Sequence, residues 1–123
     1  MGTAIALENL DIIEERDLVG AAARLAPQFQ ALLRSFADHP LVGEARGVGL
    51  IGALEFVADK STKAAFDPPG SLGGQLAELC HEEGLIIRAI GDVIAFCPPL
   101  IITSEQIDEL FDRFGRALAR FEA

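Results

Sequence analysis

Basic residues are scarce in this sequence of 123 residues, in which ten Lys and Arg stand against 19 Asp and Glu. The formal net charge of −9 argues against nucleic acid or an anionic membrane surface as a partner, because such surfaces are bound by patches of Lys and Arg. No apolar run approaches the roughly 20 residues that span a bilayer. The N-terminus also lacks a basic segment followed by an apolar one, the pattern of a secretory signal. We therefore expect a cytoplasmic protein with no membrane segment.

Cysteine is rare too: Cys80 and Cys97 form no C-x-x-C pair, and no His lies near Cys97 at ligand spacing. His81 adjoins Cys80 but falls on a different helix face, so we interpret it as a surface residue and expect no metal site. A single disulfide is one interpretation of the two cysteines. We favour two reduced and buried thiols in a cytosolic protein.

Half of the residues are apolar (50%) and about a quarter are charged (24%), which is typical of one globular domain. The apolar spacing predicts a helical segment over residues 3–37. Pro40 ends it, because the residue before a proline is disfavoured in the helical region. We expect the charged residues 14–17 to end or bend this segment, and Pro27 to lie at a kink or in the first turn of a new helical piece.

The second part of the chain changes character. Residues 48–57 alternate as a half-buried strand, and a polar loop follows over residues 59–71. An apolar stripe at helical spacing then begins at Leu72, and the helix closes at Gly84, a residue that suits the left-handed position after a helix.

Two further strands and a helix complete the chain. Ile86–Ile87 and Val93–Cys97 flank a turn at residues 89–92, which predicts an antiparallel hairpin. Residues 103–106 (TSEQ) match a capping box, and apolar residues follow them at helical spacing. The order helix, strand, helix, hairpin, helix predicts an α+β domain with a small, mostly antiparallel three-stranded sheet covered by helices.

Residues 47–52 (GVGLIG) match G-x-G-x-x-G, the pattern that holds a dinucleotide pyrophosphate. Such a site needs a buried strand before the first glycine and a helix after the third. Here the preceding residues are polar and broken by Pro40, while the following ones alternate as a strand. We therefore expect no nucleotide site, and interpret the glycines as permitting a bulge or close packing at a strand's start.

Arg88 is the one candidate for a binding residue. It stands where a predicted strand meets its turn, among apolar residues and with no acidic neighbour of the same parity. One interpretation is an arginine whose stem lies on apolar surface and whose head reaches water. The other is a carboxylate receptor, since a guanidinium can bind a carboxylate through two parallel hydrogen bonds. Ser, His and Asp occur without the spacing of a nucleophilic motif, so we name no catalytic residue.

Three stretches together resemble a known family. They are ALENLDIIEERDLV, RGVGLIGALEF and CHEEGLIIRAIGDVIAFCPPLIITSEQIDELFDRFGRAL. In this order and spacing they resemble the C-terminal part of class III aminotransferases, pyridoxal-phosphate enzymes of fold type I that include the ω-transaminases. The resemblance implies that residues 1–123 are a single C-terminal small domain, with 3–37 as an N-terminal helical segment and 43–123 as an α+β core.

The resemblance also implies which part of the parent enzyme binds the cofactor and which part binds the substrate. In the family a lysine of the large domain forms the Schiff base with pyridoxal phosphate. Lys60 and Lys63, the two lysines here, fall in the polar loop, so we expect no cofactor bound covalently to this chain. In amine:pyruvate-type members an arginine at the place of Arg88 binds the substrate carboxylate and can swing away. The expected partners are the large domain of the same parent chain, a small amine or keto-acid substrate, and a second copy in a homodimer.

The parent is then expected to transfer an amino group between an amine or ω-amino acid and a keto acid such as pyruvate, while the isolated chain is inactive. One alternative is a free-standing binding or regulatory module that grips an amino acid or keto acid through Arg88. Another is an interaction domain, because an apolar surface once covered by the large domain would drive self-association.

Overall fold

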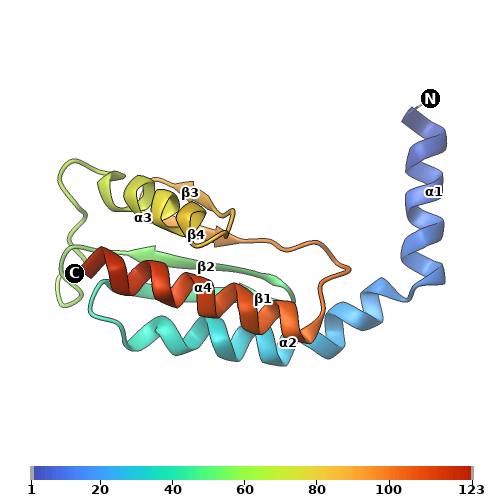
Figure 1. Ribbon diagram of the computed structural model, residues 1–123, viewed down its shortest axis with the longest axis horizontal. Coiled ribbons are helices and arrows are strands. Elements are labelled where there is room, and N and C mark those ends of the chain that lie inside the picture. Colours follow the sequence, from blue (N-terminus) through green and yellow to red (C-terminus); the bar gives the residue numbers. More distant parts are fainter. Residues whose placement is uncertain (1, 123) are drawn as a thin grey trace.

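The computed structural model describes residues 2–122, which fold into four α-helices, one 3₁₀ turn and four strands (Figure 1). The elements are α1 (Gly2–Glu15), α2 (Leu18–Ser35), η1 (Phe36–Asp38), β1 (Val42–Val48), β2 (Ile51–Phe56), α3 (Ser71–Glu82), β3 (Arg88–Ile90), β4 (Val93–Phe96) and α4 (Ser104–Glu122).

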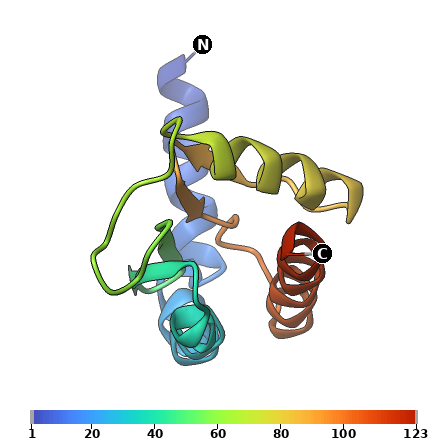
Figure 2. The ribbon, with the colours of Figure 1, turned by 90° about the vertical axis from the view of Figure 1, so that its left-hand side faces the viewer.

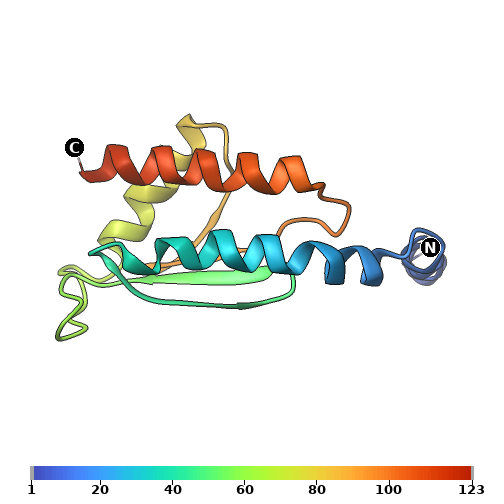
Figure 3. The same cartoon turned by 90° about the horizontal axis from the view of Figure 1, so that it is seen from below.

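The strands form one antiparallel sheet in the order β1-β2-β4-β3. One face of this sheet is covered by α2, α3 and α4 (Figure 2, Figure 3). Alternate residues of β2 and β4, such as Leu54 and Ile94, point to that face and are fully buried. Their neighbours point to the opposite face, which is covered by no helix of the described residues 2–122 and which we call the open face. The α+β class is as predicted.

The prediction of three strands is wrong, because residues 42–48 form a fourth strand, β1. Its inner positions after Val42 hold small residues, Ala45 and Gly47, in place of large apolar ones. They are small because α2 lies close: a Cβ on Gly47 would come within 2.9 Å of the Gln30 side-chain oxygen. The usual alternation of large apolar and polar residues is therefore missing from the sequence of β1.

The glycine pattern lies in the hairpin that joins β1 to β2. Gly49 has a φ of +59° at the turn, a conformation that favours glycine. Gly52 lies within β2, and a Cβ there would come within 2.4 Å of Leu33 on α2. The third glycine therefore starts no helix, so the geometry of a dinucleotide site is not met. Close packing, as predicted, accounts for Gly47 and Gly52, while the turn accounts for Gly49; the three glycines belong to the β1–β2 hairpin and not to the start of one strand.

The N-terminal helical segment is interrupted between Glu15 and Leu18, as predicted from the charged residues 14–17. Helix α1 ends at Glu15, and Asp17 begins α2 by accepting a hydrogen bond from the Gly20 amide at 3.2 Å. Pro27 lies inside α2 and begins no new helix. Helix α1 buries none of its described side chains and projects from the rest of the chain (Figure 1).

The β3–β4 hairpin differs from its prediction in register and turn length. The first strand is Arg88–Ile90 and not Ile86–Ile87, and it pairs with β4 around a two-residue turn, Gly91-Asp92. Gly91 has a φ of +60°, which such a tight turn requires. Because Gly91 allows a turn of only two residues, residues 89 and 90 belong to the strand and not to the turn, and Arg88 is the first residue of β3.

The predicted C-terminal end of α3 and the predicted start of α4 are confirmed. Gly84 follows α3 with a φ of +77°. At the start of α4 the Thr103 amide donates to the Gln106 side chain at 3.0 Å, and the Gln106 amide donates to the Thr103 hydroxyl at 3.3 Å, which is a capping box. Helix α4 then packs Phe114 into the core, with its ring centroid 5.0 Å from that of Phe96 on β4.

Candidate functional site

Arg88 lies on the open face of the sheet, at the outer edge formed by β3. It pairs with Ala95 on β4, which pairs with Ala53 on β2, which pairs with Arg46 on β1. One row across the open face therefore has an arginine at each end and two alanines between. The alanines are too short to cover either guanidinium.

The two arginines of this row differ in their partners. Arg46 forms ion pairs with Glu55 at 2.8 Å and with Glu44 at 3.1 Å, and these carboxylates, Glu55 first, raise the pKa of its guanidinium. Arg88 is exposed, and its guanidinium makes no hydrogen bond or ion pair with any residue in the part of the chain that the structure describes. Arg88 thus has all five N–H donors available for a ligand.

A groove of about 480 Å³ opens beside Arg88. Its floor and walls come from the segment before β3, from the end of β4 and from α4, and they are mainly apolar, with Ile87, Pro98 and Leu110 among them. One cation at the edge of an apolar groove suits a small molecule that has a carboxylate at one end and an apolar body. This arginine could be identified from the sequence but the groove could not, since the groove forms only where the segment before β3, the end of β4 and α4 come together.

The cysteines are free thiols in different surroundings. Cys80 is fully buried in α3, and this burial raises the pKa of its thiol to about 12. Cys97 is exposed and lines the groove, so the prediction of two buried cysteines is wrong for this one. It follows Phe96 at the end of β4, and the alternation of the strand turns it to the open face, away from the core. His81 is exposed, as predicted.

The two lysines lie outside the groove, in the loop between β2 and α3. The Lys60 ammonium donates to the carbonyls of Ala37 at 2.5 Å and His39 at 3.4 Å. Lys63 is exposed. Neither amine sits in an apolar pocket, the surroundings that lower a lysine pKa and make it a nucleophile. This chain therefore has no side chain that fits the role of a Schiff-base lysine.

Asp92 is a residue that the sequence analysis missed. Its carboxylate accepts hydrogen bonds from three backbone amides at the start of α3: Gly70 at 2.7 Å, Leu72 at 3.0 Å and Gly73 at 3.1 Å. Helix α3 has no capping side chain of its own, because Gly70 occupies the N-cap. An uncapped helix start and an Asp in a tight turn are the only traces of this contact in the sequence.

Within residues 2–122, no three His, Cys, Asp or Glu side chains are grouped so that they could hold a metal ion. No helix in the same range has the length and apolar character that crossing a membrane requires.

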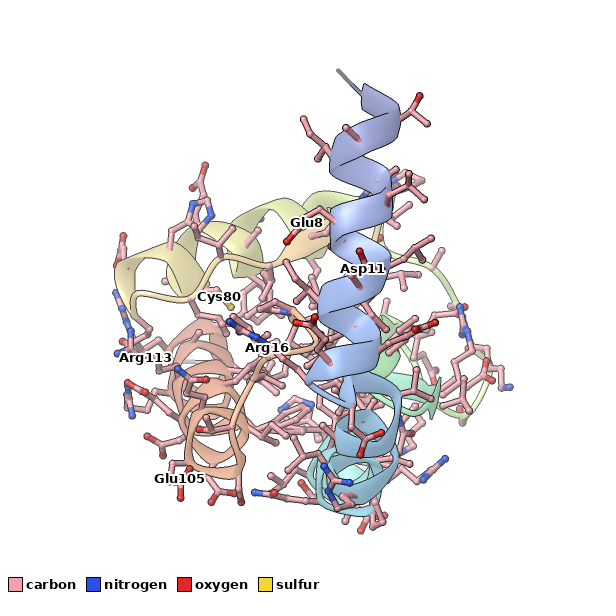
Figure 4. The ribbon with its side chains drawn as sticks, turned by 90° about the vertical axis from the view of Figure 1, so that its right-hand side faces the viewer. Glu8, Asp11, Arg16, Cys80, Glu105 and Arg113 are labelled. Atoms are coloured by element: carbon pink, nitrogen blue, oxygen red, sulfur yellow. The ribbon has the colours of Figure 1, made fainter. Side chains whose placement is uncertain are left out.

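Apolar side chains are exposed on two surfaces of the chain. On α1, Ile5 and Leu10 are 64% and 56% exposed. Figure 1 shows this helix projecting away from the other helices, and Figure 4 labels Glu8 and Asp11 on it. On the open face of the sheet, Val48 and Ile51 are 78% and 59% exposed. Apolar surface of this extent is typical of an interface.

Comparison with known proteins gives the family. The model of the family described as aminotransferase class-III matches residues 1–118. Putrescine–pyruvate aminotransferase of Pseudomonas aeruginosa is 46% identical over 111 residues, which are 89% of this chain and 24% of that protein. The ω-transaminase of Pseudomonas jessenii in complex with PMP has a similar structure, with a TM-score of 0.91 and 49% identity over 96% of this chain and 26% of that one. A PLP-bound aminotransferase mutant from Vibrio fluvialis has a TM-score of 0.92 and 40% identity over 97% of this chain and 26% of its own.

The match covers almost all of this chain but only part of each relative. The chain spans about a quarter of the length of the curated relatives it matches. The sequence identity, the matching family and the shared fold agree with one another. The chain belongs to the class III aminotransferase family.

Proposed function

We propose that this chain is the C-terminal small domain of a class III, pyridoxal-phosphate-dependent aminotransferase. Residues 3–37 are its helical segment and residues 43–123 its α+β core. The parent transfers an amino group between an amine or ω-amino acid and a keto acid such as pyruvate. The family, the printed activities of the relatives and the quarter-length match support this proposal.

The role of this chain is to bind the substrate carboxylate through Arg88. The single observation that carries the role is a guanidinium that is exposed and without a partner in the described chain, beside an apolar groove. A carboxylate bound there would receive two parallel N–H bonds from the planar guanidinium, which fixes its orientation. The groove would hold the apolar part of the same molecule and exclude water from it.

The cofactor belongs to the rest of the parent in this proposal. Pyridoxal phosphate supplies the electron sink that amino transfer needs. Lys60 and Lys63 do not fit its Schiff base, since one is bonded to backbone carbonyls and both lie outside the groove. This chain contributes binding and orientation, and by itself it would not turn over.

The partners follow from the exposed apolar surfaces. The large domain of the same parent would cover α1 and part of the open face, where Val48 and Ile51 are exposed. A second copy would complete a homodimer. The net charge of −9 gives no support to a nucleic-acid or membrane partner, and a cytoplasmic location stays a prediction from the sequence.

The test compares two acceptors in the complete protein, loaded with pyridoxal phosphate. Arg88→Leu should lower kcat/KM for pyruvate about 30- to 100-fold, because hydrogen bonds to a charged group are lost. With butanal, an acceptor without a carboxylate, the change should stay below threefold. Arg46→Leu is the matched control, since Arg46 ends the same row but is neutralised by two glutamates. Equal losses with both acceptors would refute the role of Arg88.

A second candidate is a free-standing module that binds an amino acid or keto acid. It is favoured by one observation: the groove and Arg88 are formed by this chain alone. In that case pyruvate should raise the Tm of the chain, and Arg88→Ala should abolish the rise. An unchanged Tm at millimolar pyruvate would exclude this candidate and leave the aminotransferase proposal untouched.

A further inference from the structure

Asp92 joins three parts of the fold at one point. Its carboxylate accepts the amides of Gly70, Leu72 and Gly73, and its backbone carbonyl accepts the Phe56 amide at 2.9 Å. The same residue therefore ties the β3–β4 turn to the start of α3 through its side chain and to the end of β2 through its backbone. Leu72 and Gly73 are the second and third residues of α3, whose amides have no partner within the helix.

The turn and the helix also meet through their backbones. Gly91 precedes Asp92 in the turn, and a Cβ on Gly73 would lie 1.9 Å from the Gly91 carbonyl oxygen. The backbone of the turn therefore packs directly against the backbone of α3. The carboxylate adds favourable charge at the positive end of the helix dipole.

The strand that depends on this junction carries Arg88. Strand β3 has three residues, lies at the edge of the sheet and is bonded only to β4. Arg88 stands three positions before Gly91, the first residue of the turn, which is about 10 Å at the usual rise of a strand. A short edge strand is held in place by few bonds, so the position of its turn decides where Arg88 lies over the groove.

We propose that Asp92 is a positioning residue for substrate carboxylates: by anchoring the β3–β4 turn to α3, it holds Arg88 at the edge of the groove. This proposal rests on the proposed role of Arg88. Asp92 itself touches no substrate, because its oxygens are engaged by the three amides and it does not line the groove.

The kinetic test uses the complete protein, loaded with pyridoxal phosphate, and two acceptors, pyruvate and butanal. Asp92→Ala should raise KM for pyruvate about tenfold, while kcat for both acceptors and KM for butanal change less than threefold. Asp92→Asn retains one acceptor oxygen and should raise KM for pyruvate by an intermediate amount. Glu78→Ala is the matched control, because Glu78 is an exposed acid of α3 whose carboxylate makes no hydrogen bond in the described chain. It should change none of these constants.

A second measurement reports on the anchor directly. Hydrogen exchange of the peptide spanning residues 69–74, followed by mass spectrometry on the same holoenzyme, should be at least tenfold faster in Asp92→Ala and unchanged in Glu78→Ala. An unchanged exchange rate, or a loss of kcat that is equal for both acceptors, would overturn the proposal. If Arg88→Leu left kcat/KM for pyruvate unchanged, the proposed role of Arg88 itself would fail, which is a separate result from any Asp92 variant.

Discussion

The backbone of Gly73 in α3 faces the backbone of Gly91 in the β3–β4 turn so closely that a Cβ on Gly73 would lie 1.9 Å from the Gly91 carbonyl oxygen. A Cβ on the neighbouring Gly74 would meet no atom within 4 Å outside its own stretch of the helix. Two adjacent glycines of one helix therefore stand in opposite surroundings, and this difference gives the first prediction.

Gly73→Ala should destabilise the chain by about 2 kcal/mol or more, because the methyl group meets backbone atoms that cannot move without shifting the turn. Gly74→Ala should stabilise it by about 0.5 to 1 kcal/mol, the usual gain of alanine over glycine in an exposed helix interior. Urea unfolding followed by circular dichroism measures both. Equal effects of the two substitutions would show that the close contact is absent.

Phe114→Ala should cost about 3 to 5 kcal/mol, enough to unfold much of the chain. The Phe114 ring is fully buried and lies edge-on to Phe36 and Phe96, at centroid distances of 5.1 and 5.0 Å. Leu7→Ala removes a side chain of α1 that is 59% exposed, and it should leave the midpoint of urea unfolding of the 123-residue chain unchanged. A large effect of Leu7→Ala would mean that α1 packs on the core.

Glu83 should make the stability of the chain depend on pH in the acidic range. Hydrogen bonds from Arg116 and then from Arg120, each at 2.9 Å, hold the pKa of Glu83 below its ordinary value of 4.5. A carboxyl whose pKa is lower in the folded state stabilises that state above the unfolded pKa, and the stabilisation is lost as the pH falls through the folded pKa.

The Tm difference between the wild-type chain and Glu83→Gln should therefore be constant above about pH 5 and shrink below pH 4.5. Glu78→Gln, at an exposed position of α3 where the carboxylate makes no ion pair in the described chain, is the control. A Tm difference for Glu83→Gln that does not vary between pH 3 and 7 would contradict the ion pairs as the cause.

Cys97 should react with a thiol reagent such as dithionitrobenzoate in the folded chain, while Cys80 reacts only after unfolding. Cys97 is exposed, and Cys80 is buried with a pKa raised to about 12, so it forms almost no thiolate. One equivalent of thiol is expected without denaturant and two equivalents in urea. In Cys97→Ser the first equivalent should disappear, and its persistence would place Cys80 at the surface.

Neither lysine should form an adduct with pyridoxal phosphate that borohydride can trap at stoichiometric level. Lys60 donates to two backbone carbonyls and Lys63 is an exposed loop residue, so neither amine is activated. Peptide mass mapping after reduction measures the labelling. Full labelling of Lys60 or Lys63 at equimolar cofactor would contradict the division of labour proposed for the parent.

The site could be predicted only in part. Arg88 was identified from its apolar neighbours and from the family resemblance, both of which are properties of a short stretch of chain. The sequence could not show that Arg46 lies in the same row of the sheet, nor that Glu44 and Glu55 neutralise it. Strand register decides which charges meet, and register depends on residues that are far apart in the sequence.

Local signals were enough for the ends of the helices. The capping box at Thr103 and Gln106 and the left-handed Gly84 act within a few residues, so the sequence by itself determined where α3 ends and α4 begins. It also determined the α+β class and the resemblance to class III aminotransferases, because these depend on the order of segments.

Only the tertiary structure decided the fourth strand and the role of Asp92. Strand β1 has small residues on its inner face because α2 lies against it, and a pattern of small residues does not identify a strand. Asp92 caps a helix that begins about 20 residues earlier in the chain, so no local motif describes the contact. In both cases the residue type is set by what the folded chain brings next to it, and that neighbour is distant in sequence.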